Sequence, residues 1–396
     1  MSELTKNNLL FGILFTSFTT PFIFFMMGLP MILQMKGFDP SLIGFFQLIA
    51  IPTVLKFLFS TPIDKITFTK NHYKKWIYFT AIIYIILLIS ISFLSLEENP
   101  TLIFIAILIT ALISTFIDIP LNALAIKVFH KNQRISAGSF KISSFFLAGL
   151  LGGGVFLLIY NHLGWNFTFL IMALLILCSL IALNFIEESN EKIEEVKVSF
   201  KTIFSFFKQK DIGIWTFILM FYFAFISAVW VFMKPYLISK GINPDDVAIY
   251  VGIYGSIVGF IGGIATSIIA KKFTRKSLLI SFMGFNILSV FILVIAEQIN
   301  TSFNYYFITI TFTALAIAFS SAIIFSMIMD YSRNNSRAID YSVQASLFAF
   351  TRIISAVIAG LFVSKLGYSS MFIFEIIGMI FVIFIIYKFF ENNRAC

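Results

Sequence analysis

The sequence predicts an all-α membrane protein with twelve transmembrane helices in two pseudo-symmetric six-helix bundles. Three observations support this prediction. Hydrophobic residues make up 59% of the 396 residues and charged residues only 12%, which is too apolar for a chain with a water-facing surface. A helix needs about 20 apolar residues to cross the hydrocarbon core, so short loops leave room for roughly twelve spans. A short motif also recurs at corresponding places in the two halves, which indicates duplication.

Apolar runs place these helices along the chain, separated by short polar loops. The N-terminus is short and polar, and no cleavage site of a signal peptide follows it, so we expect an uncleaved first helix. The predicted helices cover residues 9–34, 41–61, 76–96, 101–127, 137–160, 165–186, 213–236, 247–270, 277–296, 304–330, 340–364 and 369–388.

The loops alternate in charge, and this alternation predicts the orientation of the chain. One set of loops contains only three basic residues, Lys36, Lys240 and Lys365. Because lysine and arginine near helix ends resist translocation, we expect the basic loops and both termini to be cytoplasmic in an inner membrane. Basic loops facing the lipid bilayer also explain the net charge of +9 without a nucleic-acid partner. The basic residues of these cytoplasmic loops are Lys65, Lys70, Lys74, Lys75, Lys127, Lys131, Arg134, Lys271, Lys272, Arg275, Lys276, Arg333 and Arg337.

The repeat and a charged segment divide the chain. Residues 36–40 are KGFDP and residues 240–244 are KGINP, and each motif follows the first helix of a predicted bundle. We predict an N-terminal bundle over residues 1–186, a charged cytoplasmic linker over 187–211 and a C-terminal bundle over 212–396. Two bundles joined in this way can rock about a site at their interface, which is typical of secondary transporters. A duplicated membrane scaffold is the plainer alternative.

Five ionisable residues inside predicted helices are candidates for function, because a buried charge costs about 2.5–3.5 kcal/mol on insertion scales. Lys56 and Asp118 lie at matching depths, so we expect a buried ion pair. The pair either neutralises itself or opens when a substrate carboxylate displaces Asp118 or a proton neutralises it. The other three residues are Lys234, Arg352 and Glu375.

Arg352 lies near the middle of the eleventh helix, at the depth expected of a substrate site. A guanidinium stays charged and binds carboxylates in a bidentate manner, so we expect Arg352 to bind an anionic ligand or else backbone carbonyls. Lys234 lies near the outer end of its helix, from which it can reach the interface. Glu375 is also near the outer face, in a helix that is usually peripheral. We assign Arg352, Lys56 and Lys234 to substrate binding, and Asp118 and Glu375 to proton coupling.

Other function classes lack the residues that they need. The sequence has no Gly-x-x-x-x-Gly-Lys-Ser/Thr motif, so an ATP-driven pump would require a partner subunit. His72, His130 and His162 lie in separate loops, so we expect neither a catalytic residue nor a metal site. Cys178 and Cys396 support no disulfide framework. We expect no cofactor and no enzyme, although an intramembrane transferase that uses carboxylates stays open as an alternative.

Several short motifs occur in the first half of the chain. They are GLP at residues 28–30, IG at 43–44, PTVLKFLF at 52–59, PIDK at 62–65, Asp118 followed by Asn122-Ala123, and Gly152-Gly153-Gly154 followed by Gly164-Trp165. Together they resemble the AmpG and siderophore-permease branch of the major facilitator superfamily. The sequence departs from the branch pattern at Phe59, where tryptophan is usual, and at Asn122, where aspartate is frequent. The second departure puts a two-acid proton relay in doubt.

The resemblance implies the twelve-helix fold of that superfamily and transport of a small molecule. Members of the branch import muropeptides, iron–siderophore complexes or acetyl-CoA, and three intramembrane cations favour a carboxylate siderophore. Asn122 becomes a further substrate-binding candidate. By the same resemblance, Asp64 with Lys74 or Lys75 would hold a cytoplasmic gate shut.

We therefore expect a proton-coupled importer of an anionic solute, which meets Arg352 and Lys56 at the bundle interface. Protonation of Asp118 would release Lys56 or permit inward opening. We leave open whether an outer-membrane receptor system upstream delivers the solute to this chain. The alternatives are an exporter of the same fold, a non-transporting receptor or scaffold, and an enzyme.

Overall fold

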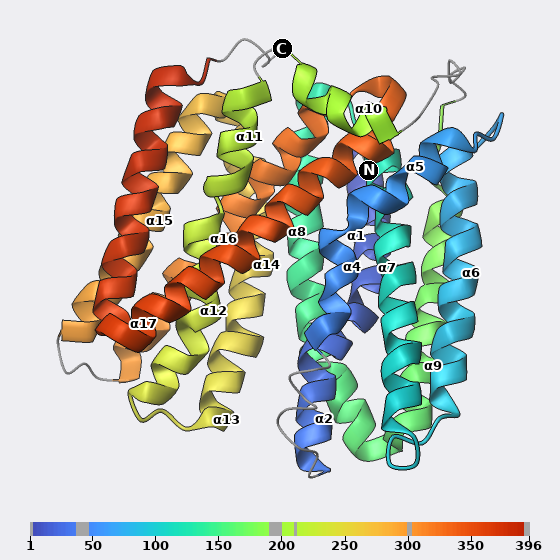
Figure 1. Cartoon of the computed structure of the whole chain (residues 1–396), viewed down its shortest axis with the longest axis horizontal. Helices are drawn as coiled ribbons and strands as arrows, with labels where there is room; N and C mark the ends of the chain where they lie inside the picture. Colours follow the sequence, from blue (N-terminus) through green and yellow to red (C-terminus); the bar gives the residue numbers. More distant parts are fainter. Residues whose placement is uncertain (1–2, 37–46, 190–199, 210–211, 299–302, 392–396) are drawn as a thin grey trace. The chain divides into compact units, whose positions relative to one another are not determined.

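The computed structural model describes residues 3–36, 47–189, 200–209, 212–298 and 303–391, and these residues form helices but no strand (Figure 1). Nine helical stretches among them are long and apolar enough to cross a membrane. The stretches over residues 131–184 and 334–389 each contain two helices, because the chain bends at Gly164 (φ 80°) and Gly367 (φ 81°). Such positive φ values favour glycine. The two bends raise the nine stretches to eleven helices.

The remaining predicted helix is the second, over residues 41–61. Residues 41–46 lie outside the described part of the chain. From residue 47 onward this helix is a series of short pieces: η2 (Gln47–Ala50), α4 (Ile51–Val54) and α5 (Lys56–Lys65). The structure thus breaks a helix that hydropathy predicted as continuous.

The chain forms two compact units that interleave in sequence. Unit 1 comprises Met1–His130, Leu147–Phe204 and Tyr331–Ser346; unit 2 comprises Lys131–Phe146, Ser205–Asp330 and Leu347–Cys396. Two long helices therefore contribute to both units. Helix α8 (Arg134–Leu150) passes from unit 2 into unit 1, and helix α17 (Arg337–Phe389) passes from unit 1 into unit 2. The predicted boundaries at residues 187 and 211 stay a prediction.

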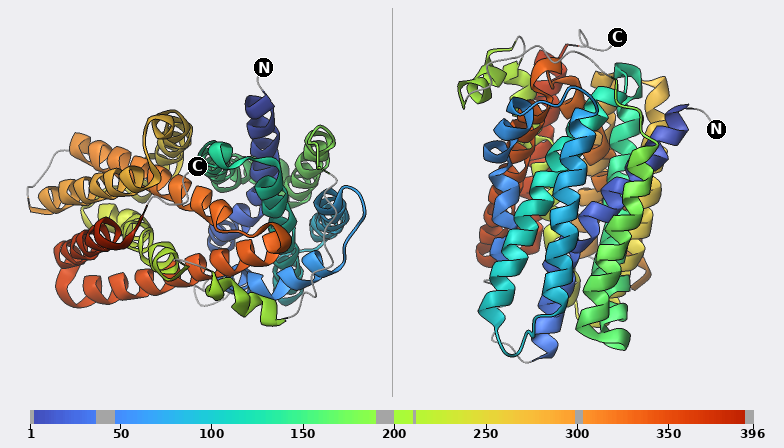
Figure 2. Two further views of the ribbon diagram at one scale, coloured as in Figure 1. Left: turned by 90° about the horizontal axis from the view of Figure 1, so that it is seen from above. Right: turned by 90° about the vertical axis from the view of Figure 1, so that its right-hand side faces the viewer.

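Unit 1 contains long apolar helices, of which α6, α7 and α9 lie side by side (Figure 2). Its interior is aromatic: the rings of Phe24 and Phe25 both pack against Phe169, and all three side chains are fully buried. Besides α4, α5 and η2, its elements are α1 (Glu3–Ile23), η1 (Phe24–Gly28), α2 (Leu29–Met35), α6 (His72–Ser92), α7 (Pro100–Val128), η4 (Leu151–Val155), α9 (Phe156–Asn184) and α10 (Phe200–Ser205).

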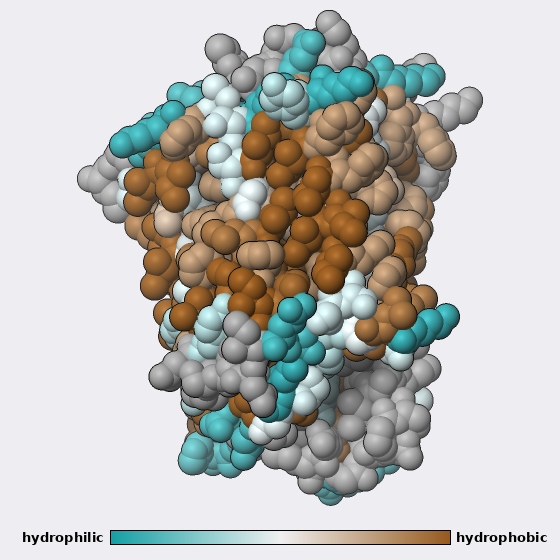
Figure 3. All heavy atoms as spheres, turned by 90° about the vertical axis from the view of Figure 1, so that its left-hand side faces the viewer, coloured by the Kyte–Doolittle hydropathy of each residue, from teal (hydrophilic) through white to brown (hydrophobic). Residues whose placement is uncertain are grey.

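Unit 2 exposes a broad hydrophobic band between two hydrophilic ends (Figure 3). Ile377, Phe381 and Phe384 of α17 are more than half exposed, as expected of side chains that face lipid. Its other elements are η3 (Lys131–Gln133), η5 (Phe206–Lys208), α11 (Ile212–Phe221), α12 (Ala224–Ser239), α13 (Pro244–Val247), η6 (Ala248–Tyr254), α14 (Gly255–Ile269), η7 (Ala270–Lys272), α15 (Arg275–Gln298) and α16 (Phe303–Asp330), while η8 (Asn334–Ser336) precedes α17 in unit 1.

Candidate substrate and proton site

Lys56 and Asp118 are in direct contact within unit 1. Nζ of Lys56 lies 2.5 Å from Oδ2 of Asp118. The hydroxyl of Tyr341 donates to the same oxygen at 2.6 Å, and the amide of Asn122 donates to Oδ1 at 2.8 Å. The side chain of Lys56 is 11% exposed and that of Asp118 is 28% exposed. These three donors hold the carboxylate, which is still partly accessible.

The local backbone explains how these four side chains meet. Leu55 has φ −86° and ψ 10°, so α4 ends there and Lys56 begins α5. Asp118 and Asn122 are four residues apart on α7 and therefore share one face of the helix. Tyr341 lies in the second turn of α17. A cation at a helix N-terminus is disfavoured by the helix dipole, and the contact with Asp118 offsets this penalty.

This cluster, which we call the Lys56 cluster (Lys56, Asp118, Asn122 and Tyr341), can respond to a proton or to an anion. A proton on Asp118 removes the negative charge that attracts Lys56 and turns one oxygen into a donor. A carboxylate of a solute could also replace Asp118 beside Lys56, since an ammonium group has three donors. In both cases the ion pair opens.

Arg352 lies in the unit 2 part of α17 and contacts aromatic rings. Its guanidinium carbon is 5.6 Å from the ring centroid of Phe223 and 5.7 Å from that of Phe348. The side chain is exposed and has no ion pair or side-chain hydrogen bond with any residue that the structure describes. Aromatic faces attract the cation without using its N–H groups. The guanidinium therefore offers its donors to a ligand.

Lys234 and Glu375 have no charged partner in the described part of unit 2. Lys234 is half-buried in α12, beside Pro235. Glu375 is 1% exposed, and neither of its carboxyl oxygens has a hydrogen-bond partner. The helix that we expected to be peripheral thus buries its carboxyl group. Because burying an unpaired carboxylate costs free energy, a proton or a cation bound at Glu375 would lower that cost.

Asp64 lies near the end of α5 and is 8% exposed. Its Oδ2 accepts the backbone N–H of Ile339 at 3.0 Å, in the first turn of α17, and its Oδ1 accepts the hydroxyl of Tyr73 at 3.4 Å. Burial raises the pKa of Asp64 to about 7, although the N–H donors of α17 oppose this shift. Asp64 therefore contacts the start of α17.

The lysines that we expected beside Asp64 have other partners. Nζ of Lys74 donates to the carbonyl of Ile186 at 2.8 Å. Nζ of Lys75 lies 5.1 Å from the ring centroid of Phe68. Neither lysine bonds to Asp64, because the carboxylate faces the N-terminal N–H groups of α17 while Lys74 reaches the end of α9. A role of Asp64, Lys74 and Lys75 in a gate stays a prediction.

Comparison with known proteins identifies the family. The family model described as Major Facilitator Superfamily matches residues 9–348. The chain belongs to the Major Facilitator Superfamily. Among curated relatives, Putative transporter AmpG 4 of Rickettsia felis is 26% identical over 381 residues, which cover 89% of each chain. Putative transporter AmpG 3 of Rickettsia prowazekii is 24% identical over 396 residues, which cover 94% of this chain and 93% of the relative.

Solved structures of this superfamily share the fold. The chain superposes on FucP in its outward conformation with a TM-score of 0.75 and 15% identity, over 98% of this chain and 99% of that one. It superposes on the proton:xylose symporter XylE with a TM-score of 0.72 and 12% identity, over 98% and 96%. The twelve-helix fold is confirmed, and so is the resemblance to AmpG transporters. The chain is a membrane transporter of the Major Facilitator Superfamily.

Two residues of this superfamily member were missed in the sequence. In the sequence, Tyr341 is the second residue of the predicted helix 340–364, and nothing beside it indicates a partner for its hydroxyl. Glu188, the second residue of the predicted charged linker, accepts the backbone N–H groups of Tyr73 and Lys74 at 3.2 and 3.1 Å. It also pairs with Lys127 at 3.1 Å, with side chains 0% and 3% exposed. A glutamate that follows an apolar run resembles any polar loop residue, so hydropathy carries no signal for this cap.

Basic loop residues that we used only for orientation also form ion pairs. In unit 2, Asp330 lies 2.8 Å from Arg275 and 3.3 Å from Arg134. In unit 1, Arg333 pairs with Asp340 at 2.7 Å. Loop arginines of this superfamily member therefore fix helix ends within each unit.

Proposed function

We propose that the chain is a proton-coupled secondary transporter that imports an anionic small molecule across the inner membrane, with both termini in the cytoplasm. The Lys56 cluster is the observation that carries this proposal. It places a cation against a partly accessible carboxylate that a proton can neutralise. The charge difference between the loops supports the orientation.

In this proposal Asp118 carries the coupling proton. As a carboxylate it holds Lys56 and accepts the hydroxyl of Tyr341. When it takes up a proton, the ion pair is lost and the bond to Tyr341 weakens. Tyr341 and Arg352 are both in α17, eleven residues apart, so the state of Asp118 acts on the helix that carries the second cation. Glu375 is the second candidate for proton binding, because its oxygens lack donors.

The substrate contacts follow from the same groups. Arg352 presents N–H donors that suit a carboxylate, and Lys56 can bind an anion once Asp118 is neutral. Asn122 donates to Asp118 and becomes a substrate donor only when that bond opens. Lys234 offers a further half-buried ammonium. At the cytoplasmic end, Asp64 and the start of α17 form the proposed gate, with Lys74 and Lys75 nearby on α6.

A carboxylate siderophore carrying iron is our first substrate candidate, because Lys56, Lys234 and Arg352 lie within predicted membrane helices. An outer-membrane receptor system would then supply it. A muropeptide is the second candidate, favoured by the names of the curated relatives. The alternatives for the same residues are acetyl-CoA as the substrate, and export of an anion instead of import.

Uptake into proteoliposomes tests the proposal. The purified chain is reconstituted and given a ferric carboxylate siderophore, with an inward proton gradient and with or without a protonophore. We expect uphill uptake that the protonophore abolishes. Asp118→Asn should lose uphill accumulation but keep exchange of labelled for unlabelled solute, because Asn cannot carry the proton. Glu98→Gln, which changes an exposed carboxylate, serves as the matched control.

Three outcomes would change the proposal in different ways. Uphill accumulation by Asp118→Asn with unchanged pH dependence would show that this residue does not couple the proton. Uptake of muropeptides in place of the siderophore would change the substrate and leave the coupling intact. Flux in vesicles of known orientation that runs only outward would make the chain an exporter.

A further inference from the structure

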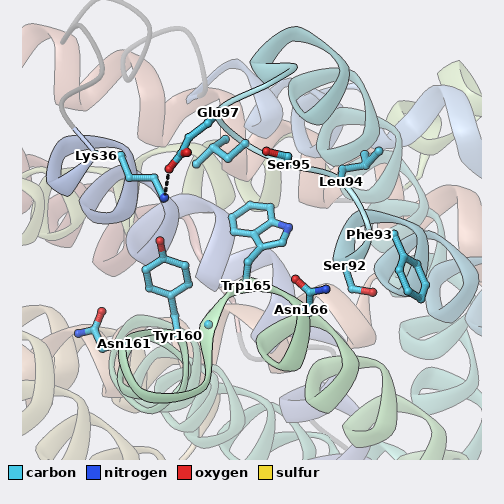
Figure 4. A pocket seen from close by; sticks show the side chains of 12 residues that line it. Lys36, Ser92, Phe93, Leu94, Ser95, Glu97, Tyr160, Asn161, Trp165 and Asn166 are labelled. Carbon is cyan, nitrogen blue, oxygen red and sulfur yellow. Dashed lines mark hydrogen bonds and ion pairs between the residues drawn. The ribbon is translucent and has the colours of Figure 1, made fainter.

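A pocket of about 550 Å³ lies at one end of unit 1 (Figure 4). Its walls come from the end of α2, the segment between α6 and α7, and the bend of α9 at Gly164. No residue of the Lys56 cluster lines it. The volume falls within the range of about 300–1,000 Å³ that is usual for small-molecule sites. The charge of the loops predicts that this end of the unit faces outside.

Two amides in this pocket are not used by the fold. Asn161 and Asn166 both line it, both are exposed, and neither forms a hydrogen bond with a residue of the described structure. Each amide has two donor hydrogens and an acceptor oxygen. Such groups can bind hydroxyl groups of a ligand without first breaking a bond within the protein.

Trp165 supplies a fixed aromatic ring in this pocket; Figure 4 shows Asn166 next to it, whereas Asn161 lies farther away, beyond Tyr160. Its indole N–H donates to the carbonyl of Ile91 at 2.9 Å, and its ring packs against Phe169 with centroids 4.6 Å apart. Figure 4 places Trp165 in the middle of the pocket residues, with Tyr160 beside it. A ring held in one orientation costs little entropy when a ligand stacks on it. The apolar C–H face of a sugar ring is a suitable partner for it.

The charges of the pocket compensate each other. Lys36 forms an ion pair with Glu97 across its wall. The pair raises the pKa of Lys36 and lowers that of Glu97, so both stay charged near neutral pH. An anionic ligand would have to displace Glu97, whereas a neutral ligand can hydrogen-bond to both members of the pair. The pocket therefore favours a neutral, hydroxyl-rich molecule.

A comparison with the corresponding end of unit 2 shows which features of the pocket occur in both units. Lys240 pairs there with Glu297 at 2.8 Å, and the chain bends at Gly367. Around this pair the rings of Tyr236 and Tyr368 pack at a centroid distance of 5.2 Å. The lysine–glutamate pair and the glycine bend thus occur in both units.

The side chains on either side of the glycine bend differ between the units. Asn161 and Asn166 lie three residues before and two residues after Gly164; the same positions around Gly367 hold Ser364 and Ser369. The hydroxyl of Ser364 bonds to the carbonyl of Leu361 at 3.1 Å. The two amides are therefore specific to unit 1 and are not required by the bend.

We propose that this pocket of unit 1 is a binding site for a neutral saccharide, which stacks on Trp165 and bonds to Asn161 and Asn166. The site is separate from the proposed anion transport and does not depend on it. A saccharide, or the sugar part of a larger solute, would be held there at the predicted outer face.

Calorimetric titration of the full chain in lipid nanodiscs tests this site. The probes are glucose, galactose, N-acetylglucosamine and maltose, with citrate as a charged comparison. We expect saturable binding of at least one sugar and none of citrate. The double change Asn161→Ala with Asn166→Ala should weaken sugar binding about tenfold, as two lost hydrogen bonds imply. His162→Ala, an exposed neighbour that does not line the pocket, is the control.

Trp165→Phe tests the stacking separately, because it keeps an aromatic ring and removes the larger indole face. It should weaken binding less than the double change. Thermal unfolding of all variants shows whether they are folded. The proposal is overturned if no sugar binds saturably, if the folded double variant binds as the parent does, or if citrate binds and is lost with Lys36→Met.

Discussion

The two units treat the ionisable residues inside their helices in different ways. In unit 1, Lys56 is bound to Asp118, and Tyr341 and Asn122 complete the cluster. In unit 2, Arg352 lies against two phenylalanine rings and Glu375 is buried, and neither has a charged partner among the described residues. Unit 1 thus balances its charges internally, whereas unit 2 leaves them to be balanced by something else.

This difference indicates a division of roles. A paired charge can switch between two states, since a proton or an anion must break the pair before Lys56 becomes available. An unpaired guanidinium such as Arg352 does not switch, and it offers its donors to whatever anion arrives. If the comparison is right, changes in unit 1 will affect stability and coupling, whereas changes in unit 2 will affect substrate affinity with little loss of stability.

The largest effect should come from breaking the pair in unit 1. Lys56→Met leaves Asp118 without its cation, and we expect a loss of about 2–3 kcal/mol, below the range for fully buried pairs because the Asp118 side chain is 28% exposed. The double variant Lys56→Met with Asp118→Asn should recover most of this loss. Unfolding in detergent measures both, and Lys70→Met, an exposed lysine, is the control. Additive losses in the double variant would show that the pair has no coupling energy.

The next effect concerns Arg352 in unit 2. Arg352→Ala and Arg352→Lys should raise the KM for the anionic solute about tenfold or more, which corresponds to the loss of one charge-assisted contact. Stability should change by less than about 1 kcal/mol, because no described residue relies on this guanidinium for an ion pair. Lys365→Met, an exposed cation of the same helix, is the control. A large loss of stability with an unchanged KM would instead assign Arg352 a structural role.

Hydropathy and helix length predicted the parts of this structure that depend on lipid. Apolar runs predicted eleven of the helices. The positions of Lys56 and Asp118 along their helices predicted equal depths in the membrane, and the two side chains form an ion pair. The break at Leu55 was not predicted, because a broken helix has the same average hydropathy as a continuous one.

Contacts between distant segments could not be predicted from periodicity. Asp64 was expected beside Lys74 or Lys75, but it accepts the N–H of Ile339, which is 275 residues away in the chain. A backbone donor has no signature in the sequence, so charge alone suggested the lysines. Glu188 shows the same limitation, because its partners are mainly N–H groups at the start of α6.

Asp64 also extends the comparison to the helix ends. Asp330 of unit 2 is bound by two arginines, whereas Asp64 of unit 1 has no ion pair in the described structure. The pKa of Asp64 is raised to about 7, so folding favours its protonated form. Its contribution to stability is fully present below its unfolded pKa, about 3.9, and is lost as the pH rises towards 7.

Asp64→Asn should remove this pH dependence, because an amide is neutral throughout and can still accept the N–H of Ile339. Between pH 5 and 7 the parent should lose stability relative to the variant by at most about 1.4 kcal/mol per pH unit, the limit for one proton. Unfolding of both proteins across this range measures the difference. Glu187→Gln, an exposed carboxylate near the same end of unit 1, should show no such divergence. Parallel pH profiles for Asp64→Asn and the parent would contradict this prediction.

The smallest effect on stability is expected at Glu375. A variant at this position also distinguishes the roles of Glu375 and Asp118, the two carboxyl groups assigned to proton coupling. Glu375→Gln keeps the shape of a buried side chain without hydrogen-bond partners, so stability should change by less than about 1 kcal/mol. If Glu375 binds a second proton, the variant should carry fewer protons per solute while Asp118 still drives uphill uptake. Simultaneous measurement of proton and solute flux gives this ratio. An unchanged ratio would leave Asp118 as the only coupling carboxyl group of the proposal, with unit 2 contributing substrate affinity alone.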